Sequence, residues 1–462
     1  MTQTKDGSLE AWRATIKGLV ITPDDVGYDE ARKLWNAGID RRPAVIVQCS
    51  SAADVAASLG FAQSSGLEIA VRGGAHSMPG HSSCDDGLMI DLTRLNAVTV
   101  DPESRRARVQ GGALLRDLDA ATQAHGLAVP AGVVGHTGVG GLTLGGGMGW
   151  LTRQGGLSID NLVSAEVVVA DGRILRAAED DNADLFWALR GGGGNFGVVT
   201  EFEFRLHEVG PIVQFGLLFW PQDQTVEALR LMRDVIADLP RSLNAIPAVA
   251  LTAPPAPFVP VEHHHKAGCA LLLTGFGDAA EHQRVVDRIH AALPPLFEVV
   301  SPMPYVAVQQ LLDEANAWGF YGYEKSGYFE NLTDEVIDIV AEHAPLKGSP
   351  LSVLLFYRLD QAYTEVGDND TAFGGGRTPR YIGFFIGLCP AAEMLDAERQ
   401  WVRSLWDALH PHMMGDGTYI NALNEDDDQR IRATYGTKYD RLTQVKTKYD
   451  PHNVFHRNAN IK

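Results

Sequence analysis

The sequence predicts an α+β protein with more than one globular unit, and three observations support this class. A chain of 462 residues with 45% hydrophobic content is long enough to bury a large core. Glycine is dense in the first 200 residues and thins out after Gly210-Pro211. Beyond that point strand-like runs alternate with helical stretches, which is typical of an α+β unit with a mainly antiparallel sheet.

The first part of the chain opens with a βαβ-like pattern. Apolar spacing predicts helices at residues 52–64 and 114–125. Short apolar or alternating runs, most of them rich in β-branched residues, predict strands at residues 44–47, 67–71, 88–92, 98–100, 107–110, 164–170 and 198–206.

The second part carries longer strand-like runs and two clear helical patterns. Helices are expected at residues 226–239 and 281–293. Strands are expected at residues 213–219, 270–274, 353–358 and 381–388. The segment from 427 to 460 is charged and helical, and then turn-rich at 449–453.

Charge and hydropathy exclude several classes of function. The net charge is −19, from 39 Lys and Arg against 58 Asp and Glu, and no basic stripe is present to match a phosphate backbone. The beginning of the sequence has no apolar segment after a basic start, and no run approaches the roughly 18 apolar residues of a membrane span. We therefore expect a cytoplasmic protein that binds neither nucleic acid nor membrane.

Cysteine and histidine spacing argues against metal sites and disulfides. Cys49, Cys84, Cys269 and Cys389 lie far apart with no CxxC pair, so we expect reduced, buried thiols. The run His263 to His265 lies in a Pro-rich neighbourhood without carboxylates at ligand spacing, so a solvated loop is favoured over a metal site.

Three glycine clusters before residue 200 are the strongest chemical signal. Each offers a row of backbone N–H groups of the kind that binds a diphosphate, and together they suit a large dinucleotide. Gly145 to Gly149 is followed by Trp150, so it is not a P-loop, and Gly138 to Gly141 lacks the spacing of a Rossmann fingerprint. Tight turns explain any single cluster equally well.

Four segments resemble one known family in its own order along the chain. Residues 71–82 (VRGGAHSMPGHS) resemble the FAD-diphosphate loop of the berberine-bridge-enzyme-like branch of the vanillyl-alcohol-oxidase flavoproteins. Residues 138–150, 184–197 and 449–455 fit the same family. The resemblance implies a two-part PCMH-type FAD-binding domain, at 1–208 and 420–462, with an inserted antiparallel-sheet substrate domain backed by helices at 209–419.

The resemblance also implies the cofactor contacts. His76 falls where the family bonds its histidine to the flavin 8α-methyl, and a neutral imidazole nitrogen is a competent nucleophile for that chemistry. Val134 stands where many relatives carry a second, cysteinyl link, so none is expected. The expected FAD-binding residues are His76, Arg72, Gly73, Gly74, Ala75, Ser77, Gly80, His81, His136, Thr137, Gly138, Gly140, Gly141, Gly145, Gly146, Gly149, Trp150, Gly197, Val198, Asn453 and Asn458. The family's usual glutamine in the last FAD-contacting turn is replaced by Ala459.

Tyr419 and Asn421 form the YxN element in which the family often places its catalytic base. A phenol with an ordinary pKa of about 10 must become more acidic to accept a proton at neutral pH. A tyrosine that only packs at a domain interface is the alternative reading. Thr137, a small residue, falls where the family controls access of O2 to the flavin, which favours an oxidase. Tyr321, Tyr323, Glu324 and Tyr357 are candidates for the substrate face.

The predicted function is oxidation of a small alcohol, amine, phenolic or polyketide intermediate, with hydride transfer to flavin N5 and reoxidation by O2. An oxidative cyclase or oxygen-transferring enzyme of secondary metabolism and a carbohydrate oxidase are the alternatives within the family. A flavin-binding redox module without turnover and an NAD-dependent dehydrogenase are the alternatives outside it. The expected partners are the substrate and O2, and a homodimer is left open.

Overall fold

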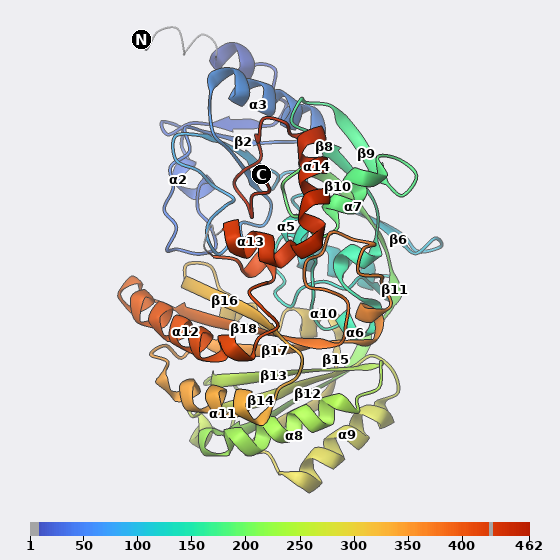
Figure 1. The fold of residues 1–462 in the computed structure, drawn as a ribbon, viewed down its shortest axis with the longest axis vertical. Helices are drawn as coiled ribbons and strands as arrows, with labels where there is room; N and C mark the ends of the chain where they lie inside the picture. Colours follow the sequence, from blue (N-terminus) through green and yellow to red (C-terminus); the bar gives the residue numbers. More distant parts are fainter. Residues whose placement is uncertain (1–8, 425–427) are drawn as a thin grey trace.

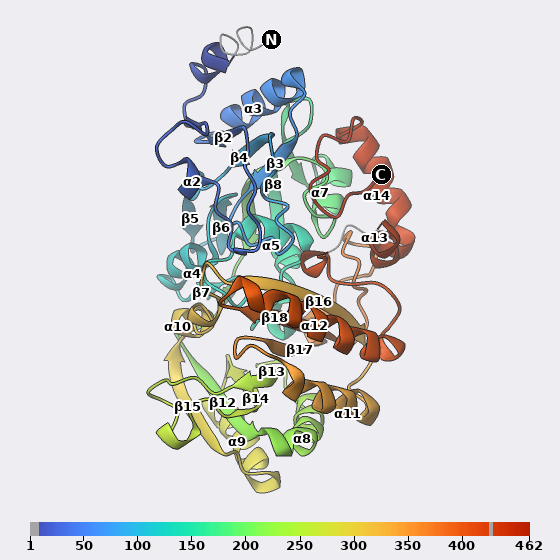
Figure 2. The same ribbon diagram turned by 90° about the vertical axis from the view of Figure 1, so that its left-hand side faces the viewer.

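The computed structural model describes residues 9–424 and 428–462 and shows two parts stacked along the longest axis (Figures 1 and 2). One part holds strands β1 to β11, and the other holds a large sheet with its helices. Within these described residues, no helix combines the length and the apolar character that crossing a membrane requires. The structure confirms the α+β class predicted from the sequence.

A four-stranded sheet opens the first part, in the order β1-β2-β4-β3. Its strands are β1 Leu19–Ile21, β2 Val45–Gln48, β3 Ile69–Arg72 and β4 Leu88–Asp91. Strands β2 and β3 both run parallel to β4, and α3 (Ala52–Ser65) connects them, as the βαβ-like pattern predicts. The Ser51 hydroxyl caps α3 by accepting the Asp54 N–H at 3.2 Å.

A five-stranded antiparallel sheet follows, in the order β5-β6-β10-β8-β9. Its strands are β5 Val98–Asp101, β6 Arg106–Gln110, β8 Leu162–Val168, β9 Ile174–Ala178 and β10 Val198–Arg205, and a small pair joins β7 Leu127–Ala128 to β11 His207–Glu208. The helices of this part are α2 Tyr28–Ala31, α4 Leu115–Gln123, α5 Val139–Gly145, α6 Thr152–Gly155 and α7 Ala183–Leu189.

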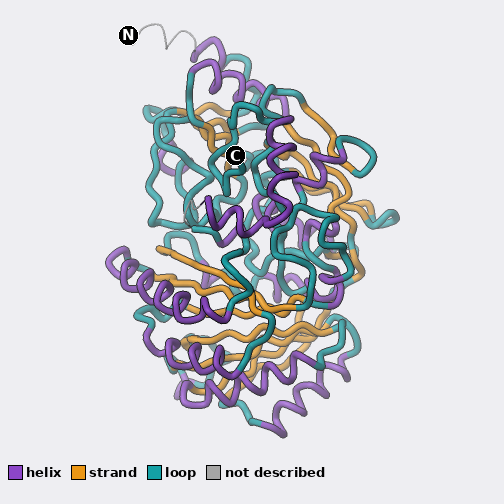
Figure 3. Tube along the Cα trace, in the orientation of Figure 1, coloured by secondary structure: helices purple, strands orange, loops and turns teal. Residues whose placement is uncertain are grey.

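A seven-stranded antiparallel sheet forms the second part, in the order β15-β12-β14-β13-β17-β18-β16. Its strands are β12 Ile212–Pro221, β13 Leu243–Thr252, β14 Ala267–Gly275, β15 Phe297–Pro304, β16 Tyr321–Phe329, β17 Val353–Leu359 and β18 Arg380–Cys389. Helices α8 Thr225–Ala237, α9 Ala279–Ala292, α11 Asp334–His343 and α12 Leu395–Leu409 pack on one face and bury a core there (Figure 3). The short helix α10 (Tyr305–Gln309) contacts α4 of the first part.

The other face of the large sheet looks toward the first part. A second core lies there, in which Tyr357 and Ile382 of the sheet pack with Trp150 and Tyr419. Side chains at alternate positions of a strand point to opposite faces of the sheet, so Tyr357 and Ile382 face the first part and not the helices. Their packing joins the two parts through apolar contacts.

The chain then returns to the first part through α13 (Asp428–Tyr435) and α14 (Tyr439–Tyr449), and α14 packs beside α7 (Figures 1 and 2). The buried Lys446 ammonium anchors this return: it donates to Asp450 Oδ2 at 2.7 Å, Asn195 O at 2.9 Å and Phe455 O at 2.8 Å. Asp450 in turn accepts the N–H groups of Val454 and Phe455. Burial lowers the pKa of Lys446, and the Asp450 carboxylate opposes this shift.

Replacing Lys446 by methionine should lower the free energy of unfolding by about 3–5 kcal/mol, because Asp450 is left as a buried charge without its cation. Urea unfolding followed by tryptophan fluorescence measures this. The matched control is Lys448→Met on the same helix, whose exposed ammonium pairs with Asp184, and it should cost no more than about 1 kcal/mol. If the free energy of unfolding falls equally in the two variants, the buried hydrogen bonds of Lys446 add no more stability than a surface ion pair.

The predicted strands and helices are all present, with ends shifted by a few residues. The four cysteines are free and buried, as expected. The strands not predicted from the sequence are β1, β7, β9, β11, β13, β15 and β16, and β13 carries Pro247 although it pairs on both sides. The glycine-rich segment after Gly138 contains a helix, α5, which glycine content alone disfavours.

Candidate active site

Two glycine loops meet backbone to backbone at the centre of the first part. A Cβ atom on Gly74 would overlap the backbone of Gly138, and a Cβ atom on Gly138 would overlap the backbone of Gly74. Only glycine permits this approach. The contact holds the loop after β3 against the start of α5 and places the backbones of both along one cavity.

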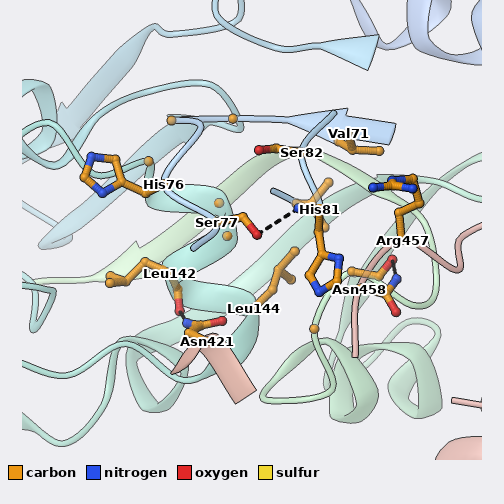
Figure 4. Close-up of a pocket in the computed structure, with 18 of the residues that line it drawn as sticks. Val71, His76, Ser77, His81, Ser82, Leu142, Leu144, Asn421, Arg457 and Asn458 are labelled. Atoms are coloured by element: carbon orange, nitrogen blue, oxygen red, sulfur yellow. Dashed lines mark hydrogen bonds between the residues drawn. The ribbon is translucent and has the colours of Figure 1, made fainter. Parts of the chain in front are cut away.

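The cavity is lined by residues from both ends of the described chain. Figure 4 shows the His76 imidazole at one end of the group of side chains and Arg457 and Asn458 at the other. The lining comprises Ile69, Val71, Gly73, Gly74, Ala75, His76, Ser77, Pro79, His81, Ser82, Leu92, Gly111, Thr137, Gly138, Gly140, Gly141, Leu142, Leu144, Gly193, Gly194, Gly197, Val198, Val199, Phe202, Ile420, Asn421, Leu423, Phe455, Arg457, Asn458 and Ala459.

The lining combines an apolar wall with polar atoms that lack partners. Ser82 Oγ, Asn458 Oδ1 and Arg457 Nε are buried, and none of them has a hydrogen-bond partner among the described residues. Buried polar groups are rarely left unpaired, because each costs about 1–3 kcal/mol. A dinucleotide with hydroxyl, phosphate and ring acceptor groups suits these atoms and the glycine N–H groups, so the residues present fit FAD.

His76 sits among aromatic rings at its end of the cavity. Trp35 stacks on its imidazole at a centroid distance of 5.0 Å, and Trp318 approaches edge-on at 6.5 Å. Its Nε2 lies 2.7 Å from His136 Nδ1. Burial, with a smaller effect from His136, lowers the pKa of His76 to about 3, so the ring is neutral at physiological pH.

Tyr419 and Asn421 converge on the glycines that follow α5. The Tyr419 hydroxyl oxygen accepts the Gly147 N–H at 3.0 Å and an Asn421 Nδ2–H at 2.9 Å. Asn421 also donates to Leu142 O at 3.1 Å, which fixes its amide. Burial raises the pKa of Tyr419 to about 12, while the two hydrogen bonds act in the opposite direction. Burial thus opposes the acidic phenol expected from the sequence, and the two hydrogen bonds favour it.

The structure brings most of the sequence-predicted site residues to the cavity. Of the set named above, the residues in the lining are Gly73, Gly74, Ala75, His76, Ser77, His81, Thr137, Gly138, Gly140, Gly141, Gly197, Val198, Asn421 and Asn458. Tyr419 lies directly behind Asn421, and His136 lies behind His76. Ala459 is also in the lining, so the lost glutamine has not removed the C-terminal turn from the cavity.

The remaining predicted contacts lie outside the lining: Arg72, Gly80, Gly145, Gly146, Gly149, Trp150 and Asn453. Arg72 faces away, with an ion pair to Asp91 at 4.0 Å and a hydrogen bond to Ala31 O. Gly145 and Gly146 pack against Asn421 and Tyr419. Trp150 is 1% exposed in the core between the two parts.

Arg457 and Ser82 are the polar lining residues that the sequence analysis did not name. Arg457 NH1 pairs with Glu68 at 3.2 Å, which holds the guanidinium at the cavity. The only available signal was their position beside motifs already recognised, since Ser82 ends the first loop and Arg457 follows the 449–455 segment.

The face of the large sheet that looks toward the first part carries four half-buried side chains. Glu324 on β16 pairs in register with Ile386 on β18, and Phe384 pairs with Leu355 on β17. All four side chains are only partly buried, unlike their neighbours on the helical face. Phe384 packs edge-on against Tyr419 at 6.0 Å, so this row borders the Tyr419 site.

Comparison with known proteins gives consistent matches along the chain. A family model described as "FAD binding domain" matches residues 43–178, and one described as "Berberine and berberine like" matches residues 418–462. An FAD-linked oxidoreductase of Dictyostelium discoideum is 31% identical over 97% of this chain and 95% of its own length. The (R)-6-hydroxynicotine oxidase of Paenarthrobacter nicotinovorans is 29% identical over 97% of each chain.

A solved structure of glucooligosaccharide oxidase from Acremonium strictum shares the fold, with a TM-score of 0.84 and 24% identity over 98% of this chain and 99% of that chain. Its FAD is described as 6-S-cysteinyl, 8α-N1-histidyl.

Fold, cavity and comparisons together define an FAD-dependent oxidoreductase that acts on small organic molecules. The chain belongs to the berberine-bridge-enzyme-like family of FAD-linked oxidoreductases.

Proposed function

We propose that this enzyme holds FAD covalently through His76, oxidises a small amine, and returns the electrons to O2. The observation that carries the proposal is the neutral, ring-caged His76 at one end of the cavity, with Nε2 engaged by His136 and Nδ1 without a hydrogen-bond partner among the described residues. Val134 stands in place of the cysteine of doubly linked relatives, so a single link is part of the proposal.

The bound flavin supplies a hydride acceptor for the substrate carbon and a two-electron donor for O2. The chain supplies binding, orientation and a proton acceptor. Tyr419 Oη is the proposed acceptor, because the Gly147 N–H and the Asn421 amide both donate to it and stabilise the phenolate.

Thr137 lines the cavity beside Gly138 and is the residue proposed to leave room for O2. The bulkier side chain of Thr137→Leu should therefore slow the reoxidation of reduced flavin by O2, which stopped-flow spectroscopy measures.

The proposal includes the domain division expected from the sequence. Residues 1–208 and 420–462 would bind FAD, and residues 209–419 would bind the substrate. This division is supported by the large sheet, whose strands all fall between Ile212 and Cys389, and by the return of α13 and α14 to the first part.

Glu324 favours an amine as the substrate. It is a carboxyl group on a partly exposed sheet face otherwise built from Ile386, Phe384 and Leu355, and no described residue forms a hydrogen bond with its side chain. A charge in an apolar site needs a partner, and a substrate ammonium group provides one. The similarity to (R)-6-hydroxynicotine oxidase supports the same class.

Glu324→Gln should raise the KM for an amine substrate by about 10- to 100-fold at pH 8, because a charge-assisted hydrogen bond is lost. Burial raises the pKa of the Glu324 carboxyl to about 7. A raised pKa leaves the group protonated below pH 7 and charged above it, so the wild-type KM should fall as pH rises through 7. The KM of the variant should stay flat over this range.

The control is Glu330→Gln, which removes an exposed carboxylate just after β16 and should leave the KM unchanged. A wild-type KM that does not respond to pH between 6 and 8 for an amine of high pKa would exclude Glu324 as its counter-ion.

Anaerobic titration tests the function as a whole. A panel of amines, alcohols, phenols and oligosaccharides is added to the yellow protein, and loss of the flavin absorbance identifies the substrate. Recovery of absorbance on admitting air, with hydrogen peroxide formed, supports an oxidase. Bleaching by oligosaccharides alone would identify a carbohydrate oxidase, and no bleaching by any class would indicate a redox module without turnover.

A further inference from the structure

The imidazole rings of His76 and His136 form a short hydrogen-bonded pair beside the cavity. His76 Nε2 and His136 Nδ1 are 2.7 Å apart, and the rings are tilted by 36° with centroids at 4.8 Å. His136 itself is 9% exposed and is absent from the cavity lining. It therefore reaches the cofactor region through His76.

The contact that His136 makes on the side away from His76 determines which of the two rings donates the hydrogen bond between them. His136 Nε2 lies 3.4 Å from the backbone carbonyl of Asp313, and a carbonyl oxygen can only accept. With one proton on each ring, His136 carries its proton on Nε2 and has a bare Nδ1. That nitrogen then accepts the His76 Nε2–H, so His76 has a bare Nδ1.

The Asp313 loop is held in place independently of this pair. Asp313 Oδ1 accepts the Gly135 N–H at 2.6 Å, directly before His136. On the opposite side, Trp35 stacks on His76, and its Nε1–H donates to Asn316 O at 2.6 Å. The loop at residues 313–316 thus orients both neighbours of the His76 ring.

We propose that His136 is a positioning residue for cofactor attachment: it fixes the His76 tautomer that leaves Nδ1 bare, and it takes up the Nε2 proton as the bond to FAD forms. This inference rests on the proposed His76 link. It goes beyond that link by assigning a role to a residue that does not touch the cofactor.

The step balances as follows. A bond forms between His76 Nδ1 and the flavin 8α carbon, and that carbon loses one C–H bond, its hydrogen leaving as a proton. The two electrons of that bond reduce the flavin ring, which takes up two protons. The His76 Nε2 proton passes to His136 Nδ1, so the linked imidazole ends neutral. O2 then accepts the two electrons and two protons and leaves as hydrogen peroxide, and the oxidised, linked cofactor remains.

The test measures the rate at which FAD becomes acid-stable. Protein made under riboflavin limitation is mixed with FAD in air, and the FAD that stays with the acid precipitate is followed over time. In His136→Leu this rate should fall by about 10²-fold or more, the usual contribution of a positioned proton acceptor, while FAD still binds non-covalently. Glu314→Gln is the matched control: it removes an exposed charge next to Asp313, keeps the Asp313 carbonyl and should link at the wild-type rate.

Two amide variants separate a tautomer effect from a packing effect. Asparagine at position 136 places an oxygen near the Nδ1 site and should restore much of the rate, whereas glutamine reaches toward the Nε2 site and should not. Equal rates in His136→Asn and His136→Gln, or a wild-type rate in His136→Leu, would overturn the inference. A wild-type protein with no acid-stable FAD, or with FAD on a peptide lacking His76, would instead overturn the proposed link.

Discussion

Tyr419→Phe should lower the rate of flavin reduction by substrate by about 10²- to 10⁴-fold, the range for loss of a positioned acid–base group. The phenol oxygen is held by two donors, the Gly147 N–H and the Asn421 amide, and phenylalanine keeps the ring packing against Phe384 while removing only this atom. Anaerobic stopped-flow spectroscopy measures the reduction rate directly. The KM should change little, because the aromatic surface remains.

The pH profile gives this prediction a second readout. Burial raises the pKa of Tyr419 to about 12, so the phenolate fraction grows as pH rises. The wild-type reduction rate should therefore increase toward about tenfold per pH unit in the alkaline range, since ionisation of one group limits it. This dependence should vanish in Tyr419→Phe.

The matched control is Tyr357→Phe. Tyr357 is also buried and packs edge-on against Phe384 at 5.5 Å, but no described residue donates a hydrogen bond to its hydroxyl. Its loss should leave the reduction rate within about threefold of wild type, because burial alone does not make a phenol a base. If the flavin is reduced equally fast in the two variants, Tyr419 is not the proton acceptor.

His76→Ala should abolish acid-stable FAD completely. Its imidazole nitrogen is the proposed point of attachment, and the other histidine of the lining, His81, lies away from it beside Asn458 in Figure 4. Acid precipitation should leave all of the flavin in the supernatant, and the peptide mass should show no FAD adduct. Turnover should fall as well, because loss of the link lowers the reduction potential of the flavin.

His81→Ala is the control for this variant. His81 lies in the same loop and also lines the cavity, and its backbone N–H donates to the Ser77 hydroxyl at 3.0 Å. Because substitution by alanine keeps that N–H, the loop should hold its shape and the acid-stable FAD should remain. A His76→Ala protein that still carries FAD through acid would place the link on another residue.

Much of the cofactor site was predictable because its parts are close in sequence. Gly73 to Ser77 and Thr137 to Gly141 are compact motifs, and the backbone contact between Gly74 and Gly138 leaves one way to assemble them. The family resemblance also placed Arg72 among the FAD contacts, but β3 turns its side chain toward Asp91, outside the cavity lining. The alternation of side chains along a strand determines which face each residue points to, and a sequence motif does not show this direction.

The substrate side was less accessible to prediction. Glu324 lies in β16, whose sequence YGYEKSGYF contains two glycines and adjacent charges that disguise a strand. Its neighbours Ile386 and Phe384 come from a strand some 60 residues later, and only the register between β16 and β18 reveals their common face. The hydrogen bond between His76 and His136 was equally hidden, because the orientation of His136 depends on the carbonyl oxygen of Asp313, far away in the sequence.

The return of α14 to the first part affects when the cofactor can be captured during synthesis. Phe455, Arg457 and Asn458 complete a cavity whose opposite wall carries His76, hundreds of residues earlier in translation. A nascent chain that has exposed only its glycine loops has one side of the pocket and no clamp from Lys446 and Asp450. We therefore expect FAD to be held firmly only after residues 446–458 have been synthesised and have packed against the first part.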